Sequence, residues 1–88
     1  MTYRFRSFEI RDDMVAGIRR YVDEFITPGS FLQAIIENDL KTAIEQADEE
    51  NLRNIPAFVS YFYNETPREC WGSREKMLAW LQKRWEIK

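Results

Sequence analysis

Apolar residues recur at helical spacing along most of this chain, and this pattern limits its fold more than any other feature. Over residues 14–26 they return every three or four positions, which places them on one side of a helix. The spacing continues through 31–47, 52–63 and 77–85, with short segments between. Consecutive helices joined by short loops pack against one another. We therefore expect an all-α fold, a compact bundle of four to five short helices, in a single domain covering residues 1–88.

Residues 1–11 do not follow this spacing and are rich in aromatic and arginine side chains. Tyr3 and Phe5 would lie on one side of a strand, and Phe8 and Ile10 on the other. One short strand cannot form a sheet alone. We expect an extended N-terminal arm whose aromatic side chains pack on the helices or on a partner subunit.

Short polar side chains mark the expected helix starts, because their oxygen atoms accept a free backbone N–H of the first turn. An N-cap is expected at Asp12 or Asp13 for the first helix and at Ser73 for the last. Asp48 occupies a similar position before a further apolar run, and the acids after it favour a helix start.

Two interruptions of the apolar pattern leave alternatives open. Asn38 and Asp39 can bond to the nearby backbone, and Pro56 cannot donate a helical hydrogen bond. Each interruption either kinks one helix or separates two, and the sequence does not decide between these arrangements.

The core has to hold the fold without covalent crosslinks. Cys70 is the single cysteine, so a disulfide within the chain is excluded. A chain of 88 residues buries only about 60–65% of its unfolded surface. The aromatic residues, 15% of the chain, compensate for this thin core. A thin core and an aromatic arm both favour sharing apolar surface with a second copy, so a homodimer remains an alternative.

The composition argues against catalysis and against bound metal or cofactor. The chain has no histidine, the commonest general base and metal ligand. No base stands at a suggestive spacing from Cys70 or a serine. The acidic run after Asp48 lacks the ligand spacing and glycine of a calcium loop, and there is no glycine-rich phosphate loop. We expect a non-enzymatic protein with no catalytic, cofactor-binding or metal-binding residue.

Charge is distributed unevenly along the chain. Residues 1–20 carry a net charge of +2, residues 21–66 of −7 and residues 67–88 of +3. The acidic middle is suited to a basic protein partner, although solubility alone also explains it. The alternation of tyrosine, arginine and phenylalanine over residues 3–6 is typical of single-strand nucleic-acid binders. The isoelectric point near 5.2 argues against that class, so we expect a protein partner in preference to nucleic acid.

No apolar run approaches the roughly 18 residues of a membrane span, and no apolar signal segment follows the N-terminus. Together with the single cysteine, these features predict a cytoplasmic protein without a membrane partner.

Six short motifs occur in an order that resembles a known group of proteins. They are Gly17-Ile18-Arg19-Arg20-Tyr21, Pro28-Gly29-Ser30-Phe31-Leu32, Glu37-Asn38-Asp39-Leu40, Ala47-Asp48, Tyr61-Phe62-Tyr63-Asn64 and Cys70-Trp71-Gly72-Ser73. Over about residues 14–81 the chain resembles small helical proteins of unknown function encoded by bacteriophages, prophages and related mobile elements. The resemblance implies a bacterial cytosolic setting and a phage-linked role, and it transfers no catalytic residue.

These observations predict a non-enzymatic phage or mobile-element accessory protein that binds a host or phage macromolecule, with an anti-defence inhibitor as one concrete form. The candidate partner-binding residues are Arg19, Arg20, Tyr61 and Trp71. The aromatic segment 58–63 leaves two interpretations open. The more ordinary one places it in the core alone, and the other leaves Tyr61 or Phe58 exposed as an anchor, because aromatic side chains are enriched at contact centres. The alternative is a nucleic-acid-associated regulator that uses the basic aromatic N-terminal arm.

Overall fold

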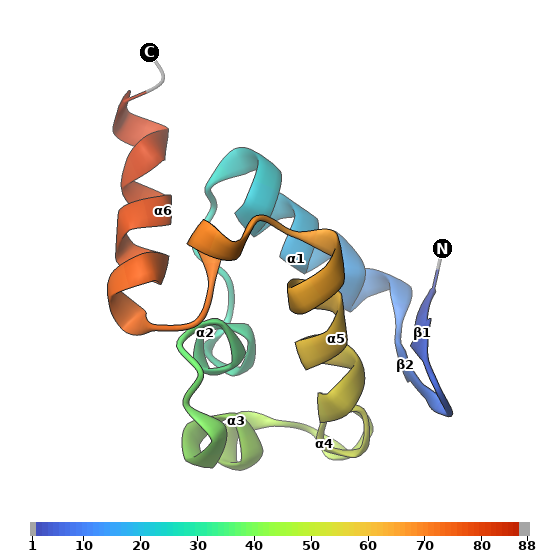
Figure 1. Cartoon of the computed structure of the whole chain (residues 1–88). Coiled ribbons are helices and arrows are strands. Elements are labelled where there is room, and N and C mark those ends of the chain that lie inside the picture. Colours follow the sequence, from blue (N-terminus) through green and yellow to red (C-terminus); the bar gives the residue numbers. More distant parts are fainter. Residues whose placement is uncertain (1, 87–88) are drawn as a thin grey trace.

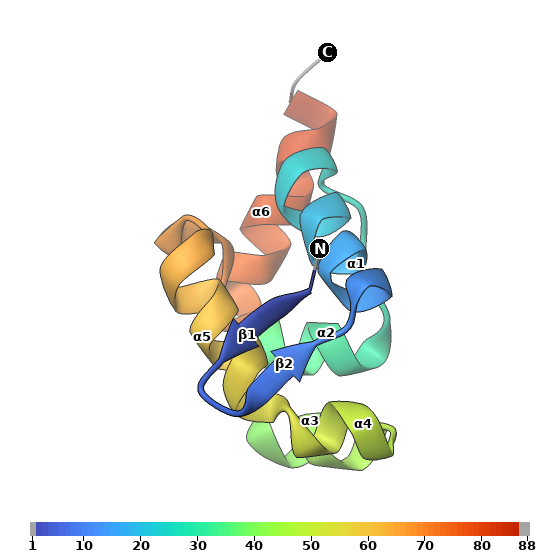
Figure 2. The same ribbon diagram turned by 90° about the vertical axis from the view of Figure 1, so that its right-hand side faces the viewer.

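The computed structural model describes residues 2–86, and this part of the chain is predominantly helical (Figure 1). Its helices are α1 (Asp12–Glu24), α2 (Ser30–Ile36), α3 (Leu40–Gln46), α4 (Glu49–Arg53), α5 (Ile55–Glu65) and α6 (Arg74–Glu86), with a short 3-10 helix η1 (Arg68–Cys70) before α6. Helices α3 and α4 lie at the opposite end of the molecule from the C-terminal end of α6 (Figures 1 and 2). The described residues thus form six short α-helices, one more than the upper limit expected.

The N-terminal arm is a β-hairpin, so the prediction of a strictly all-α chain is wrong in this segment. Strand β1 (Tyr3–Phe5) pairs antiparallel with β2 (Phe8–Ile10), and Phe5 lies opposite Phe8. Arg6, in the two-residue connection, takes a φ of 55°. Such tight hairpin turns need a left-handed residue, which is usually glycine or asparagine. Arginine gives no such signal, which is why the sequence did not indicate the turn.

The hairpin packs on the helices, as expected for the arm. Tyr3, Phe5 and Phe8 lie half-buried against the core, and Ile10 is fully buried within it. The strands contact α5, which runs alongside them (Figure 2). The aromatic side chains of the arm are therefore part of the fold of one chain.

Both interruptions separate two helices. Asn38 takes a left-handed φ of 63° after α2, and the Asp39 carboxylate then accepts the backbone N–H of Thr42 at 3.2 Å to start α3. Pro56 is the second residue of α5, which follows Asn54. A proline in the first turn of a helix loses no intrahelical hydrogen bond, because the N–H groups of that turn have no partner in the helix. Pro56 is therefore accommodated at the start of a new helix, and α4 and α5 are distinct.

Two of the three expected N-caps are confirmed. Asp48 accepts a backbone N–H of α4 at 2.7 Å, and Ser73 accepts one of α6 at 3.1 Å. The third expectation is wrong, because Arg11 holds the N-cap position of α1 and gives no side-chain cap. Asp12 and Asp13 lie in the first turn instead, where the helix dipole also favours acids.

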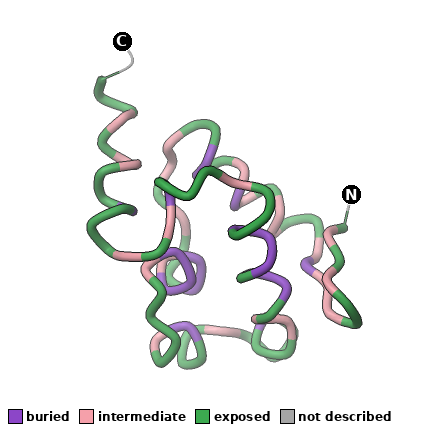
Figure 3. The backbone as a smooth tube through the Cα atoms, in the orientation of Figure 1, coloured by how far each residue is buried: buried purple, intermediate pink, exposed green. Residues whose placement is uncertain are grey.

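The core lies between α1, α2 and α5, where most buried residues are found (Figure 3). Tyr21, Phe58 and Phe62 are its largest fully buried side chains. The Tyr21 hydroxyl donates to the carbonyl of Cys70 at 2.7 Å, which ties α1 to η1. Burial raises the pKa of Tyr21, so this hydroxyl stays protonated and able to donate.

Helix α6 is attached to the body along one side. Met77 is buried, and the Trp80 ring packs on Phe25 with 5.6 Å between centroids. The Trp80 indole Nε1 also donates to the carbonyl of Val22 at 3.2 Å. Trp85, further along the helix, is 71% exposed. Only part of α6 therefore contributes to the core.

We expect Tyr21→Phe to lower the free energy of unfolding by about 1–3 kcal/mol, because it leaves a buried carbonyl without its donor. Urea denaturation followed by circular dichroism measures this loss. Tyr63→Phe is the matched control, because the Tyr63 side chain is exposed, and it should stay within about 0.5 kcal/mol of the wild type. Equal losses in the two variants would show that the bond between Tyr21 and Cys70 contributes nothing specific.

Candidate functional site

Helix α5 carries apolar side chains on more than one face, and the fold buries only one of them. Phe58, Tyr61 and Phe62 point into the core. Val59 and Tyr63, four residues apart, lie together on the outer side and are 44% and 77% exposed. The outer side of α5 is therefore an apolar surface that contacts water.

A groove of about 650 Å³ follows this outer side, and we call it the α5 groove. Its lining residues are Phe5, Ile55, Pro56, Val59, Ser60, Tyr63 and Asn64. Phe5 comes from β1 and all the others come from α5, so the hairpin supplies one wall. The groove exists only because the hairpin lies alongside α5 (Figure 2).

The apolar surface continues onto α3. Leu40 lines a smaller hollow together with Ile55 and Val59, which also line the α5 groove. Ile44 follows Leu40 by one helical turn, and both side chains are exposed. An apolar band therefore extends from α3 across α5 to the hairpin.

Ser60 and Asn64 of the α5 groove are engaged in internal hydrogen bonds. The hydroxyls of Tyr3 and Ser60 lie 2.8 Å apart, and the Asn64 amide donates to the carbonyl of Ser60 at 3.0 Å. None of the lining residues, all within the described part of the chain, carries a charge. The groove can thus recognise an apolar shape, but it offers no cation to a phosphate.

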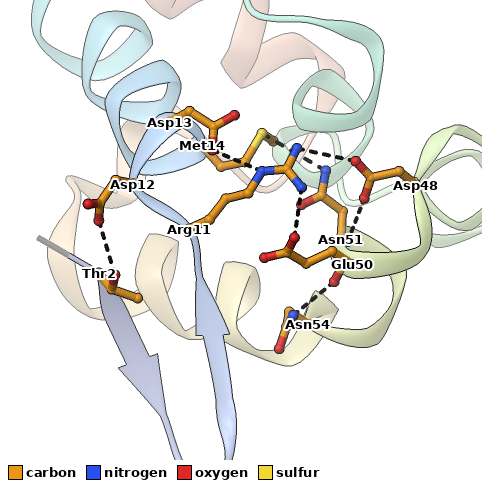
Figure 4. Close-up of polar contacts among 9 residues, drawn as sticks. All are labelled: Thr2, Arg11, Asp12, Asp13, Met14, Asp48, Glu50, Asn51 and Asn54. Carbon is orange, nitrogen blue, oxygen red and sulfur yellow. Dashed lines mark hydrogen bonds and ion pairs between the residues drawn. The ribbon is translucent and has the colours of Figure 1, made fainter.

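Polar contacts hold the hairpin against α4 (Figure 4). Arg11 directly follows β2, and its guanidinium donates to the carboxylates of Asp48 and Glu50, each at 3.2 Å. The backbone N–H of Glu9 in β2 donates to the side-chain oxygen of Asn54 at 3.0 Å. These contacts fix the position of the hairpin and thereby that of one wall of the α5 groove.

Hydrogen bonding lowers the pKa of Asp48 below its usual value of 3.8. The bond from the backbone N–H of Asn51 is the larger cause, and the bond from Arg11 adds to it. Asp48 both caps α4 and binds Arg11. Its negative charge therefore stabilises the start of α4 and the contact between α4 and the hairpin.

Much of the acidic surface expected from the sequence is paired within the chain. Glu37 forms an ion pair with Arg74 at 3.3 Å, and Glu45 forms one with Lys41 at 2.9 Å. Asp39 caps α3, as described above. Together with the pairing of Asp48 and Glu50 by Arg11, these contacts reduce the negative charge that the middle of the chain presents to a partner.

Two of the four candidate partner-binding residues contact each other inside the fold. Arg19 forms an ion pair with Asp23 at 2.8 Å and donates to the hydroxyl of Tyr61 at 3.3 Å. Tyr61 is only 7% exposed, and Phe58 is fully buried. Tyr61 and Phe58 are therefore core residues on the inner face of α5, as the more ordinary interpretation held, and the alternative of an exposed anchor at either residue is wrong.

The other two candidates lie apart from the α5 groove. Trp71 is half-buried and packs on Phe62, with 5.8 Å between ring centroids. Arg20 is exposed and lines a different cleft, beside α1. Helical spacing would place Val59 and Tyr63 inward as readily as Phe58 and Phe62, so the sequence did not identify them as the exposed pair.

Within residues 2–86, no group of three or more acidic, cysteine or histidine side chains is placed to hold a metal ion. None of the helices described is long and apolar enough to cross a membrane. Comparison with protein-family models, curated proteins and solved structures found no match to the chain.

We expect acidification to weaken the fold in part through Asp48. Because the folded-state pKa of Asp48 lies below its unfolded value near 3.8, its contribution is complete above that value and is lost as the pH falls through the folded pKa. Asp48→Asn keeps a capping side chain without the charge. Urea denaturation at about pH 7 and about pH 3 should therefore show a smaller loss of unfolding free energy in this variant than in the wild type.

Glu49→Gln is the control for this measurement, because Glu49 forms no hydrogen bond or ion pair through its side chain in the described structure. It should follow the wild type. The same pH dependence in Asp48→Asn as in the wild type would contradict the role given to the Asp48 charge.

Proposed function

We propose that this chain is a non-enzymatic binding protein that receives another protein in the α5 groove. The observation that carries the proposal is the 77% exposure of Tyr63 beside Val59, in a groove that continues onto Leu40 of α3. Single exposed apolar side chains are ordinary on protein surfaces. A contiguous and hollow apolar band is characteristic of an interaction site.

The chemistry of the groove favours a protein over a small polar ligand or a nucleic acid. A small-molecule site combines an apolar lining with a few converging polar groups that orient the ligand. In the α5 groove the side chains of Ser60 and Asn64 are already engaged within the fold. Tyrosine at the edge of an apolar hollow is a common centre of protein contacts.

The resemblance to small phage and prophage proteins supports a phage-linked role in the bacterial cytoplasm. On that basis we propose that the partner is a host or phage protein, and inhibition of a host defence protein is one concrete form of this activity. Glu45 on α3 is paired with Lys41, and Asp48 and Glu50 at α4 are paired with Arg11, which favours the apolar band over the acidic surface as the contact.

Tyr63→Ala should weaken binding of the partner by about tenfold or more, because a central interface tyrosine contributes strongly to affinity. The partner is first captured from a bacterial lysate and purified, and its affinity is then measured by calorimetry. Leu78→Ala is the matched control, because Leu78 is an exposed apolar residue on α6, outside the α5 groove. An unchanged affinity for Tyr63→Ala, or equal losses in both variants, would contradict the proposal.

The alternative, a regulator that binds nucleic acid through its arm, predicts a salt-sensitive complex with single-stranded DNA. Tyr3 is packed on α5, Arg4 lies 3.9 Å from Glu9, and Arg6 stacks over a phenylalanine ring of its own strand pair. We therefore expect fluorescence anisotropy to show no such complex with random-sequence DNA at low or physiological salt. A complex that disappears in the variant Arg4→Gln/Arg6→Gln would favour the regulator instead.

A further inference from the structure

A second hollow, of about 470 Å³, lies between α1 and the segment that leads into α2. We call it the α1 cleft, and it shares no lining residue with the α5 groove. Met14, Phe31 and Leu32 give it an apolar lining, and Asp13 and Arg20 add one charge of each sign. Since these two charged residues are seven positions apart on α1, they lie on the same side of the helix and about 10 Å apart along its axis.

Arg20 is the only cationic residue in the lining of the α1 cleft. Its side chain forms no hydrogen bond or ion pair with any residue from 2 to 86, whereas the neighbouring Arg19 is held by Asp23. Its Nη2 atom lies 3.6 Å from the position that a Cβ on Gly17 would occupy. The guanidinium is therefore folded along α1 toward the cleft, with its donors available.

Gly17 lies in the interior of α1, where glycine weakens a helix relative to alanine. A Cβ at this position would lie 3.4 Å from Cδ1 of Leu32, which is an ordinary contact distance. Packing therefore does not demand glycine here. What the missing side chain does provide is open space between Leu32 and the guanidinium of Arg20.

We propose that the α1 cleft binds the carboxyl-terminal end of a short apolar peptide, with its carboxylate on Arg20. A guanidinium matches a carboxylate with two parallel hydrogen bonds. The apolar lining would receive the peptide side chains. Asp13 lies one helical turn before Gly17, beside which the guanidinium sits, so an amino or amide N–H of the bound peptide can reach that carboxylate.

The Asp13 carboxylate also argues against ligands with two negative charges. Its carboxylate already accepts one hydrogen bond from Arg11, at 2.9 Å, and it remains largely exposed on the cleft. A doubly charged phosphate would be repelled by this acid and balanced by only one arginine. A singly charged carboxylate joined to an apolar body fits both charges better.

The test uses the full chain, labelled with ¹⁵N, and the tripeptide Leu-Ala-Leu in three forms. The free acid should shift the amide signals of Gly17 and of residues 29–32. The C-terminal amide should have an affinity lower by about tenfold or more. The N-acetylated acid tells whether the bound carboxylate belongs to the C-terminus of a longer chain or to a free peptide. Equal binding indicates the C-terminus of a longer chain, and weaker binding indicates a free peptide whose amino group is read by Asp13.

Substitutions assign the carboxylate to its partner. Arg20→Gln should reduce the affinity for the free acid to that for the amide, and Arg20→Lys should restore part of it. Arg53→Gln removes an exposed arginine from α4, outside the cleft, and should change nothing. Gly17→Ala should raise the thermal midpoint and weaken binding, because its methyl group fills the cleft.

Three results would overturn the inference. They are the absence of any shift with the free acid, equal affinity for the acid and the amide, and an unchanged affinity in Arg20→Gln. None of these results depends on whether the α5 groove binds a protein.

Discussion

The complete burial of Phe58 and Phe62, one turn apart on α5, fixes the rotation of that helix about its axis. Once Phe58 packs on Phe31 of α2 and Phe62 packs on Trp71, Val59 and Tyr63 have to face outward. Among residues 2–86, no further layer of helices or strands packs over this second apolar face. The hairpin covers only its edge, so the α5 groove follows directly from how the core is packed.

Local features of the fold could be predicted from the sequence, because their causes lie within a few residues. Asp39 and Asp48 each cap a helix that starts at the next residue. The face that α5 exposes could not be predicted in this way, since Tyr61 and Tyr63 are the same residue type and only tertiary packing distinguishes them. The hairpin turn was missed for a related reason, because Arg6 adopts a left-handed conformation without glycine or asparagine. The α5 groove also joins segments far apart in the chain, which spacing alone does not reveal.

Arginine side chains connect helices that are too short to be stable alone. Arg11 joins the start of α1 to α4, which has five residues. Arg19 joins α1 to α5 through Tyr61 and through the carbonyl of Glu65 at 3.3 Å. Exposed pairs of this kind each add little free energy. Their main contribution is geometric, since they select one arrangement of short elements around a small core.

The contacts of the hairpin determine when it can settle during synthesis of the chain. Tyr3 bonds to Ser60, and Arg11 bonds to Asp48, so both partners are synthesised after the hairpin. A two-stranded hairpin is marginally stable by itself. During synthesis the hairpin therefore has no surface to pack on until α5 has emerged from the ribosome. Its docking is a late step in folding of the chain. A ribosome-bound nascent chain stalled before α5 would therefore lack the α5 groove, because the groove forms only when Phe5 of the hairpin lies beside that helix.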